Sequence, residues 1–279
     1  FRDTENEDNE KTGFLDVQRK INLTDNITWE LKAGAKYRAK SRFKNTSELD
    51  AAYYLYGYHK YTILPDGSVV LKNFAGTPFE NLVIENNAII STNFLTSTPE
   101  NRYTFDDKYF LNPIINRRLL REWYSLNKNG AANSNGTSLE YADNQERKAE
   151  YYDIDENVFA TYLMNTFNLG KDITVIAGAR LEHENNKYLS KFTPGKLTGF
   201  PTPSGTLKDT SSTYKETVIL PNMHITYRPT DFMNIRAAVY KALARPDFNH
   251  RLEYYVARDG GGYTTLVVGN PDLKTAEAW

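Results

Sequence analysis

Apolar and polar side chains alternate along residues 26–42, which read NITWELKAGAKYRAKSR. The odd positions from Ile27 to Ala39 are apolar, whereas the even positions from Thr28 to Lys40 are polar, charged or glycine. A period of two is typical of a β-strand whose two faces meet different surroundings. The alternation exceeds the roughly five or six residues of an average soluble strand. We therefore predict a long strand, apolar on one face and charged on the other.

The same period recurs in other parts of the chain. Residues 173–184, 222–228 and 234–240 alternate clearly, residues 11–21 alternate more weakly, and residues 156–169 are apolar on both faces. With the first segment, these predict six strands and the start of a seventh at the C-terminal end. The smallest transmembrane barrels have about eight strands. We therefore expect the chain to be an internal portion of a larger protein.

The connections between the predicted strands fall into two length classes. Those at 22–26, 168–172 and 228–232 are short and carry turn-forming residues, whereas those from about 43 to 156 and from about 185 to 215 are long. Short and long connections alternate along the chain. A transmembrane β-barrel sorts its loops in this way, with short periplasmic turns and long extracellular loops. An antiparallel sheet with one solvated face is the alternative, because it produces the same alternation of side chains.

The cost of burying charge in lipid predicts which face of these strands meets lipid and which meets the water-filled lumen. A Lys or Arg on the lipid face near the bilayer midplane costs about 2 to 4 kcal/mol, so charge should collect in the lumen. Trp29 and Tyr227 lie near the short turns, where an aromatic girdle is expected. Two residues depart from the pattern: Lys241 must lie near the outer interface, snorkel or follow a bulge, and Pro221 predicts a bulge or a strand start. The predicted lumen-facing residues are Glu30, Lys32, Lys36, Arg38, Arg180, Glu182, His224 and Arg236.

The long segment 43–156 should fold on itself outside the membrane. YTILPDGSVVL predicts a hairpin around Pro65, Asp66 and Gly67, and NPIINRRLLREWYSLNKNG predicts a helix capped by Asn112 with Pro113 in its first turn.

An aromatic cluster precedes this hairpin. Aromatic faces bind apolar ligand surface while their polar edges stay hydrated, so such rings could contact a sugar, a peptide or a siderophore. The alternative is that they pack an extracellular lid against itself. In the same way, the lumen-facing charges could meet substrate, or could form a solvated network of salt bridges with no individual role. The candidate ligand-contacting aromatics are Tyr53, Tyr54, Tyr56, Tyr58, Tyr61 and Trp123.

Composition narrows the chemistry. The 34 Lys and Arg balance 35 Asp and Glu, which gives no electrostatic argument for nucleic acid. Cysteine is absent, and the histidines lack metal-ligand spacing. We find no phosphate-binding loop and no catalytic triad, and therefore predict no cofactor, no metal and no enzymatic activity.

In the second half of the chain a G-x-R-x-E strand precedes an L-P-x5-Y strand, a strand that ends in R-P-D-F, and a G-N-P-x-L-K loop. The motif residues are Gly178, Arg180, Glu182, Leu220, Pro221, Tyr227, Arg236, Arg245 to Phe248, and 269–274. This ordered set resembles the barrel of TonB-dependent outer-membrane receptors, in which the same motifs follow one another. The resemblance covers roughly residues 156 to 279, and the LKAGAKYR stretch is similar to the same family.

The resemblance implies an all-β fold, an antiparallel transmembrane barrel of 22 strands occluded by a plug, in the outer membrane of a Gram-negative bacterium. It implies TonB-dependent uptake of a siderophore, glycan or peptide, with the TonB complex, outer-membrane lipid and possibly a surface lipoprotein lid as partners. We expect a barrel hairpin at 1–42, a large extracellular region at 43–156, and barrel strands at 157–279 with a loop at about 185–215. Plug and TonB box are expected outside this chain.

Two alternatives belong to other classes of protein. An outer-membrane barrel hydrolase would need an acid or nucleophile beside a strand-borne histidine, for which His224 is the candidate. A soluble carbohydrate-binding sheet protein would share the alternation but not partition into membranes.

Overall fold

The computed structural model describes residues 1–51, 59–86, 88–96, 103–104, 106, 108–110, 113–199, 202–253, 255–260 and 263–279. The chain forms two compact units. The sheet unit contains Asp3–Ser47, Gln145–Thr198 and Gly205–Trp279, and the loop unit contains Phe1–Arg2, Glu48–Asn144 and Gly199–Ser204. Each unit is described by itself below.

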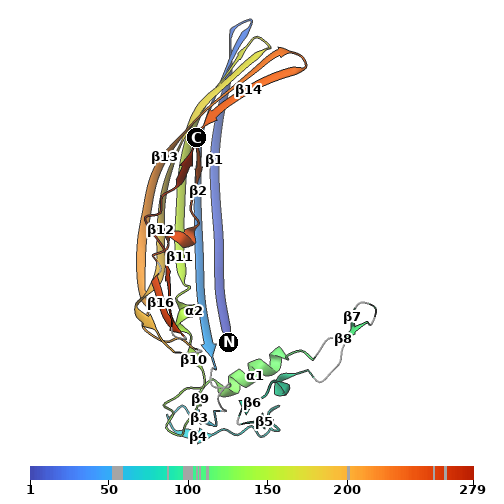
Figure 1. Cartoon of the computed structure of the whole chain (residues 1–279), viewed down its shortest axis with the longest axis vertical. Helices are drawn as coiled ribbons and strands as arrows, with labels where there is room; N and C mark the ends of the chain where they lie inside the picture. The colour runs from blue at the N-terminus through green and yellow to red at the C-terminus, as the bar shows by residue number, and fades with distance from the viewer. Residues whose placement is uncertain are drawn as a thin grey trace. The chain divides into compact units, whose positions relative to one another are not determined.

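Six long strands lie side by side in the order β1-β2-β11-β12-β13-β14, which confirms the predicted strands (Figure 1). β11 pairs antiparallel with both β2 and β12, and β13 pairs antiparallel with β12 and β14. The strand bounds are β1 Arg2–Thr24, β2 Ile27–Asp50, β11 Tyr152–Leu169, β12 Ile173–Leu197, β13 Lys208–Thr230 and β14 Met233–Tyr240.

Three short turns, at 25–26, 170–172 and 231–232, join neighbouring strands at one end of the sheet. Gly170 has φ +62°, a left-handed conformation that favours glycine in such a turn. The opposite ends differ from expectation, because β2 continues to Asp50 and β12 to Leu197. The expected loops at 43–156 and 185–215 were therefore drawn too long. Beyond Ala39 on β2 and Leu181 on β12, polar residues interrupt the odd-numbered apolar positions, so the hydrophobic period disappears although backbone pairing continues.

The C-terminal part begins a seventh strand and carries a long connection. β15 (Ala242–Ala244) pairs antiparallel with β18 (Ala276–Ala278). Between them lie α3 (Phe248–Arg251) and a hairpin of β16 (Tyr255–Gly260) and β17 (Tyr263–Val268), and β16 runs parallel to the far end of β12. We call residues 245–275 the inner connection.

The loop unit contains the predicted hairpin and several other short elements. The predicted hairpin is confirmed as β3 (Tyr61–Ile63) and β4 (Val69–Leu71), with Gly67 at φ +84° in the turn. Its other elements are β5 Ile84–Glu85, β6 Ala88–Ile89, 3-10 helix η2 Ser91–Phe94, β7 Tyr103–Thr104, β8 Tyr109–Phe110, α1 Arg117–Asn127, β9 Gly130–Ala131 and β10 Ala142–Asp143; α2 Gln145–Lys148 belongs to the sheet unit.

The predicted helix is present but begins later than expected. Asn116, and not Asn112, is the N-cap of α1, because its side chain accepts hydrogen bonds from the backbone N–H groups of Arg118 (2.9 Å) and Leu119 (3.4 Å). Asn112 lies outside the described residues.

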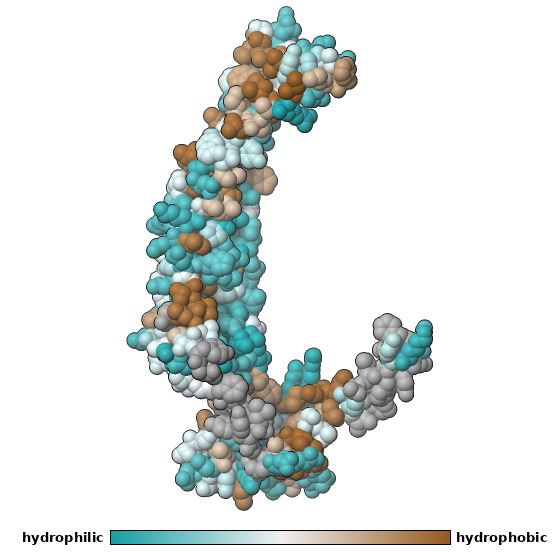
Figure 2. Space-filling view, viewed as in Figure 1, coloured by the Kyte–Doolittle hydropathy of each residue, from teal (hydrophilic) through white to brown (hydrophobic). Residues whose placement is uncertain are grey.

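The outward face of the sheet carries an apolar belt beside the short turns. The belt consists of the odd-numbered residues from Ile27 to Ala39 on β2, Phe159 to Leu169 on β11, Ile173 to Leu181 on β12, Ile219 to Tyr227 on β13 and Met233 to Val239 on β14. Many of these side chains are exposed, among them Leu163 (50%) and Ile219 (57%). Figure 2 shows hydrophobic residues gathered around the short turns at the top of the view.

The belt has the height of a bilayer core. From Phe159 to Leu169 is about 11 residues, or roughly 36 Å along the strand at about 3.3 Å per residue, and roughly 26 Å across a membrane at a tilt of about 45°. Beyond the belt the odd positions become polar, as at Asn157, Asn185 and Lys215.

The edge of the belt that is farther from the short turns comes closer to these turns from β12 to β14. On β12 the belt ends at Leu181, which pairs with Ile219, whereas on β14 it ends at Val239, which pairs with Met223. Strands that are tilted in a barrel require this drift. It explains Lys241, which lies just past the edge and forms an ion pair with Glu277 (2.7 Å).

Pro221 lies inside β13 without a register shift towards β12, so the predicted bulge or strand start was wrong. Its carbonyl accepts a hydrogen bond from the backbone N–H of Lys241 (3.0 Å), so its ring nitrogen also faces β14. β14 ends at Tyr240, beside this position. The missing N–H of proline therefore falls where the ladder is already interrupted.

Polar atoms within the belt are satisfied locally. The Trp29 indole N–H donates to the Asn165 side-chain oxygen (3.1 Å), and its ring stacks on Phe167 with centroids 6.2 Å apart. At the upper edge, the Tyr37 hydroxyl donates to Asn157 (2.8 Å). These rings correspond to aromatic girdles at two interfaces. No helix in the described ranges is long and apolar enough to span a membrane.

Replacing Leu163 by arginine tests the belt. Leu163 lies in the middle of the belt on β11, so we expect Leu163→Arg in the full-length receptor to lose about 2 to 4 kcal/mol of stability in phospholipid vesicles. The measurement is the urea midpoint of unfolding. Asn185→Arg, on the outward face of β12 beyond the belt, is the control and should cost less than about 1 kcal/mol. Equal losses would contradict the belt.

Candidate functional site

The inward face of the sheet consists of the even-numbered residues of β2, β11, β12 and β13; its buried part is apolar on β11 and β13, as at Ile154 and Val218, and mainly polar on β12. On β12 the residues Glu182, Glu184, Asn186, Tyr188 and Ser190 are buried, whereas the odd residues between them are not. The inner connection covers this face: the Ser190 hydroxyl donates to the Glu253 carbonyl (2.9 Å). A buried polar face requires partners for its polar groups, and these partners define the candidate site.

Five charged residues of alternating sign form a ladder across this face. Arg180 donates to Glu182 (2.5 Å), and Arg245 donates to both Glu182 (2.6 Å) and Glu184 (2.5 Å). Arg251 completes the ladder by donating to the other oxygen of Glu184 (2.8 Å). Each carboxylate therefore has two guanidinium partners, which are the strongest hydrogen-bonded ion pairs available to it. We call these residues the charge ladder.

Arg251 is the buried end of the ladder, with 1% exposure. Its Nε donates to the Leu273 carbonyl (2.9 Å), and its guanidinium lies 3.8 Å from the centre of the Tyr214 ring. Thr275 continues the network by donating to Glu216. Burial lowers the pKa of Arg251, but contacts with Tyr188 and Glu184 outweigh burial and raise it. Arg251 therefore ties both ends of the inner connection to the wall.

Three sequence motifs meet at this point. The G-x-R-x-E strand supplies Arg180 and Glu182, and R-P-D-F supplies Arg245, which binds Glu182. Asp247 of the same motif caps α3 by accepting from the backbone N–H of Asn249 (3.0 Å), and Phe248 packs edge-on against Tyr152.

The G-N-P-x-L-K loop closes the arrangement. Gly269 allows its backbone to approach Leu252 so closely that a Cβ would lie 1.9 Å from the Leu252 carbonyl oxygen. The backbone N–H of Asn270 donates to the carbonyl of His250 (2.7 Å). The three motifs thus build one contact between the inner connection and β12.

Gly34 of β2 lets a side chain of β11 reach β1 across the inward face of the sheet. The Tyr162 hydroxyl of β11 donates to Asp16 of β1 (2.7 Å), although β2 lies between these strands. A Cβ on Gly34 would lie 2.5 Å from the Tyr162 ring and 2.2 Å from Asp16. The aromatic ring therefore occupies the space that a side chain at position 34 would take.

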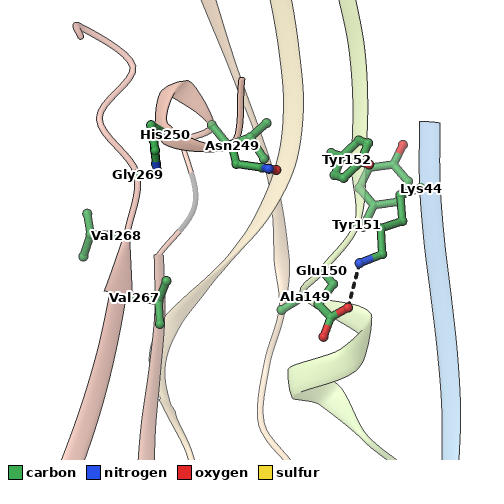
Figure 3. Close-up of a pocket in the computed structure, with 11 residues that line it drawn as sticks. Lys44, Ala149, Glu150, Tyr151, Tyr152, Asn249, His250, Val267, Val268 and Gly269 are labelled. Atoms are coloured by element: carbon green, nitrogen blue, oxygen red, sulfur yellow. Dashed lines mark hydrogen bonds and ion pairs between the residues drawn. The ribbon is translucent and has the colours of Figure 1, made fainter. Parts of the chain in front are cut away.

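A cavity of about 330 Å³ lies beyond the apolar belt, at the outer ends of β2 and β11 (Figure 3). We call it the outer cavity. Lys44 and Glu150 lie on one side, and Asn249, His250 and the Val267–Gly269 stretch lie on the other. The mixture of aromatic, apolar and convergent polar groups is typical of ligand pockets, and its volume is at the small end of their range.

Glu150 is held in its charged form beside this cavity. It accepts hydrogen bonds from Lys44 (2.8 Å) and Arg147 (2.6 Å). Burial alone would raise the pKa of the Glu150 carboxyl, but these two bonds outweigh it and lower the pKa below 4.5.

The predicted aromatic site is placed only in part. Tyr53, Tyr54, Tyr56 and Tyr58 lie outside the described residues, and Tyr61 begins β3. Trp123 is 2% exposed and packs against Phe74, Phe79 and Phe94 with ring centroids 4.9 to 5.8 Å apart. This burial makes Trp123 a core residue of the loop unit and does not support its predicted ligand contact.

The predicted inward charges lie on strands but are not one cluster. Arg180 and Glu182 belong to the charge ladder, and Lys32 lies 5.9 Å from the Tyr162 ring. His224 stacks on Tyr240 with centroids 6.2 Å apart, beside Arg236. Glu30 pairs in register with Thr166. The sequence interpretation missed Glu184 and Arg251. Glu184 follows Glu182 by two residues and therefore shares its face of the strand, and Arg251 lies shortly after the R-P-D-F motif.

In the part of the chain that the structure describes, no group of three or more His, Asp or Glu residues lies where it could hold a metal ion.

A curved antiparallel sheet with an outward apolar belt and a polar inward face defines the wall of a transmembrane β-barrel. The sequence profile described as TonB dependent receptor-like, beta-barrel matches residues 1–279. The chain belongs to this family, whose members are receptors of the Gram-negative outer membrane. The soluble carbohydrate-binding alternative is therefore wrong.

Among solved structures, the chain is similar to the siderophore receptor PiuA from Acinetobacter baumannii, with 11% identity and a TM-score of 0.39 over 93% of the chain. The chain spans about a quarter (26%) of the length of that receptor. A search of curated proteins finds no match.

The charge ladder predicts a local stability effect. In the full-length receptor, Glu184→Gln removes the charge that pairs Arg245 and Arg251 but keeps the shape, so we expect a loss of about 3 to 5 kcal/mol, as when buried ion pairs are broken. Trypsin should then cut after Arg251 or Lys274, which can be mapped by mass spectrometry. Glu10→Gln, whose pair with Lys40 is 3.9 Å and exposed, is the control. Unchanged cleavage would contradict the ladder.

Glu150 predicts a dependence of stability on pH. Its pKa is lower in the folded than in the unfolded state, so its contribution is complete above pH 4.5 and is lost as pH falls through the folded-state pKa. We expect Glu150→Gln to lower the Tm of the full-length receptor at neutral pH, with the difference shrinking as pH falls below 4.5 and through the lowered folded-state pKa. Glu5→Gln is the control, because Glu5 is exposed and forms no ion pair with a described residue. A difference that persists in acid would refute this assignment.

Proposed function

We propose that this chain is part of the barrel wall of an outer-membrane receptor that binds a nutrient outside the cell and takes it up with energy from TonB. The family match over the whole chain carries the proposal. The division of the sheet into an apolar outward and a polar inward face supports it, because a nutrient that crosses the barrel meets only the inward face. Through a plug in another part of the receptor, the TonB complex is the proposed partner.

We propose the outer cavity as one point of ligand contact. Lys44 and Tyr152 face each other in register on β2 and β11, five residues beyond the belt residue Ala39, and we therefore expect them outside the membrane. Asn249 and His250 are exposed and add hydrogen-bonding groups. A siderophore, a glycan or a peptide could each use an apolar wall with such groups.

Uptake by the native host carrying the full-length receptor tests the proposal. Cells with and without the receptor are given a labelled ferric siderophore, an oligosaccharide and a peptide. We expect energy-dependent accumulation of one class, lost when either the receptor or TonB is absent. Accumulation of none of these classes, or equal accumulation without TonB, would reject the proposed function.

A paired variant tests the outer cavity separately. Asn249→Ala with His250→Ala removes two exposed polar side chains from the cavity, and two lost hydrogen bonds should weaken ligand binding by about tenfold. His183→Ala with Asn185→Ala removes the same residue types from the outward face of β12 and should leave binding unchanged. Equal affinity of the two variants would exclude the cavity as the contact point.

A further inference from the structure

A second cavity, of about 210 Å³, lies on the inward face and is lined mainly by cations. Lys36 and Arg38 come from β2, Arg180 from β12 and Arg245 from the inner connection; Glu182 is the single carboxylate in the lining. We call it the cationic cavity. Four positive charges against one negative charge make a concave surface that favours an anion.

Strand register explains why a cavity exists here. On β11, Ala160 lies between Lys36 of β2 and Glu182 of β12, and Val158 lies between Arg38 and Glu184 in the same way. Two strand spacings separate β2 from β12 by roughly 9.6 Å. The short side chains of Ala160 and Val158 leave the space between them open, and both line the cavity.

The carboxylates nearest to this space are already engaged. Glu182 accepts from Arg180 and Arg245, and Glu184 accepts from Arg245 and Arg251. Lys36 and Arg38 form no ion pair with any residue that the structure describes. The Nε atoms of Arg38 and Arg42 are both buried without a hydrogen-bond partner among these residues, but Arg42 has ion-pair partners and Arg38 has none. A buried guanidinium without a compensating acceptor or charge is costly, so Arg38 calls for an anion.

The next two cations on the same face of β2 show the contrast. Lys40 pairs with Asp8 (3.2 Å) and Glu10 (3.9 Å) of β1, and Arg42 pairs with Asp8 (3.5 Å) and with Glu156 of β11 (3.8 Å). Continuing this spacing down β1 brings Thr12 and Phe14 beside Arg38 and Lys36, and neither carries a charge. Carboxylates of β1 and β11 therefore pair with Lys40 and Arg42, whereas no carboxylate among the described residues pairs with Lys36 or Arg38.

We propose that the cationic cavity binds a carboxylate group, with Lys36 and Arg38 as its ligands. A guanidinium and an ammonium on one strand face can together hold both oxygens of a carboxylate. The group comes either from a small organic acid in the lumen or from an Asp or Glu side chain of another part of the full-length receptor. The site does not depend on transport, so binding to the purified receptor can fail while uptake persists, and the reverse.

Citrate is the probe for the first source. The Tm of the full-length receptor in detergent is measured against citrate at constant ionic strength, with chloride as the balancing anion. For a free anion we expect a saturable rise in Tm. Lys36→Gln with Arg38→Gln should weaken the apparent affinity at least tenfold. Lys40→Gln with Arg42→Gln removes the same residue types from the same face and should keep the response.

The Tm measured without citrate tests the second source, an Asp or Glu side chain from another part of the receptor. If a receptor carboxylate occupies the site, citrate has no effect, and Lys36→Gln with Arg38→Gln lowers the Tm at neutral pH. That deficit should disappear below about pH 4, where the carboxylate is protonated, whereas a packing defect would persist. The proposal is overturned if all three proteins respond equally to citrate, or if none responds and the variant shows no deficit that acid removes.

Discussion

Backbone pairing in a sheet whose two faces meet different solvents is the constraint on which the rest of this structure depends. Every inner strand from β2 to β13 has a neighbour on both sides along its part near the short turns, with β14 pairing β13 from Asn222 to Thr230, so most N–H and C=O groups there are satisfied within the sheet, as a lipid environment requires. Side chains then divide by parity. The odd residues form the apolar belt, and the even residues form an inward face whose buried polar groups must find their own partners.

The inner connection supplies many of those partners. Without it, Glu182 would keep only Arg180, and Glu184 would lose both of its guanidinium partners. With it, buried carboxylates and guanidinium groups alternate, so that each charge is compensated where water is excluded. Motifs that are separated by about 90 residues in the chain therefore serve one contact. Lys36 and Arg38 remain outside this compensation, which makes the cationic cavity chemically distinct from the charge ladder beside it.

Sequence reasoning was accurate where the period of two reports burial directly. It predicted the six strands, the three short turns, the orientation of the faces and the hairpin at Pro65 to Gly67, because each depends on neighbouring residues. It predicted that the strands end too early at their outer ends. β2 beyond Ala39 is mostly polar on both faces, so its backbone pairing is not accompanied by a hydrophobic period. It also placed the helix cap at Asn112, because a polar residue before a proline resembles a cap, whereas Asn116 makes the actual hydrogen bonds.

The sequence by itself determined the class of fold, the two faces and the family resemblance, because strand periodicity and short motifs are local properties of the chain. Tertiary structure decided which charges meet. Arg245 and Arg251 reach β12 only because the inner connection folds back on it, and Ala160 opens the cationic cavity only because register places it between Lys36 and Glu182. It also buried Trp123 in a core of the loop unit. Contacts between distant residues depend on register and chain path, which no single segment encodes.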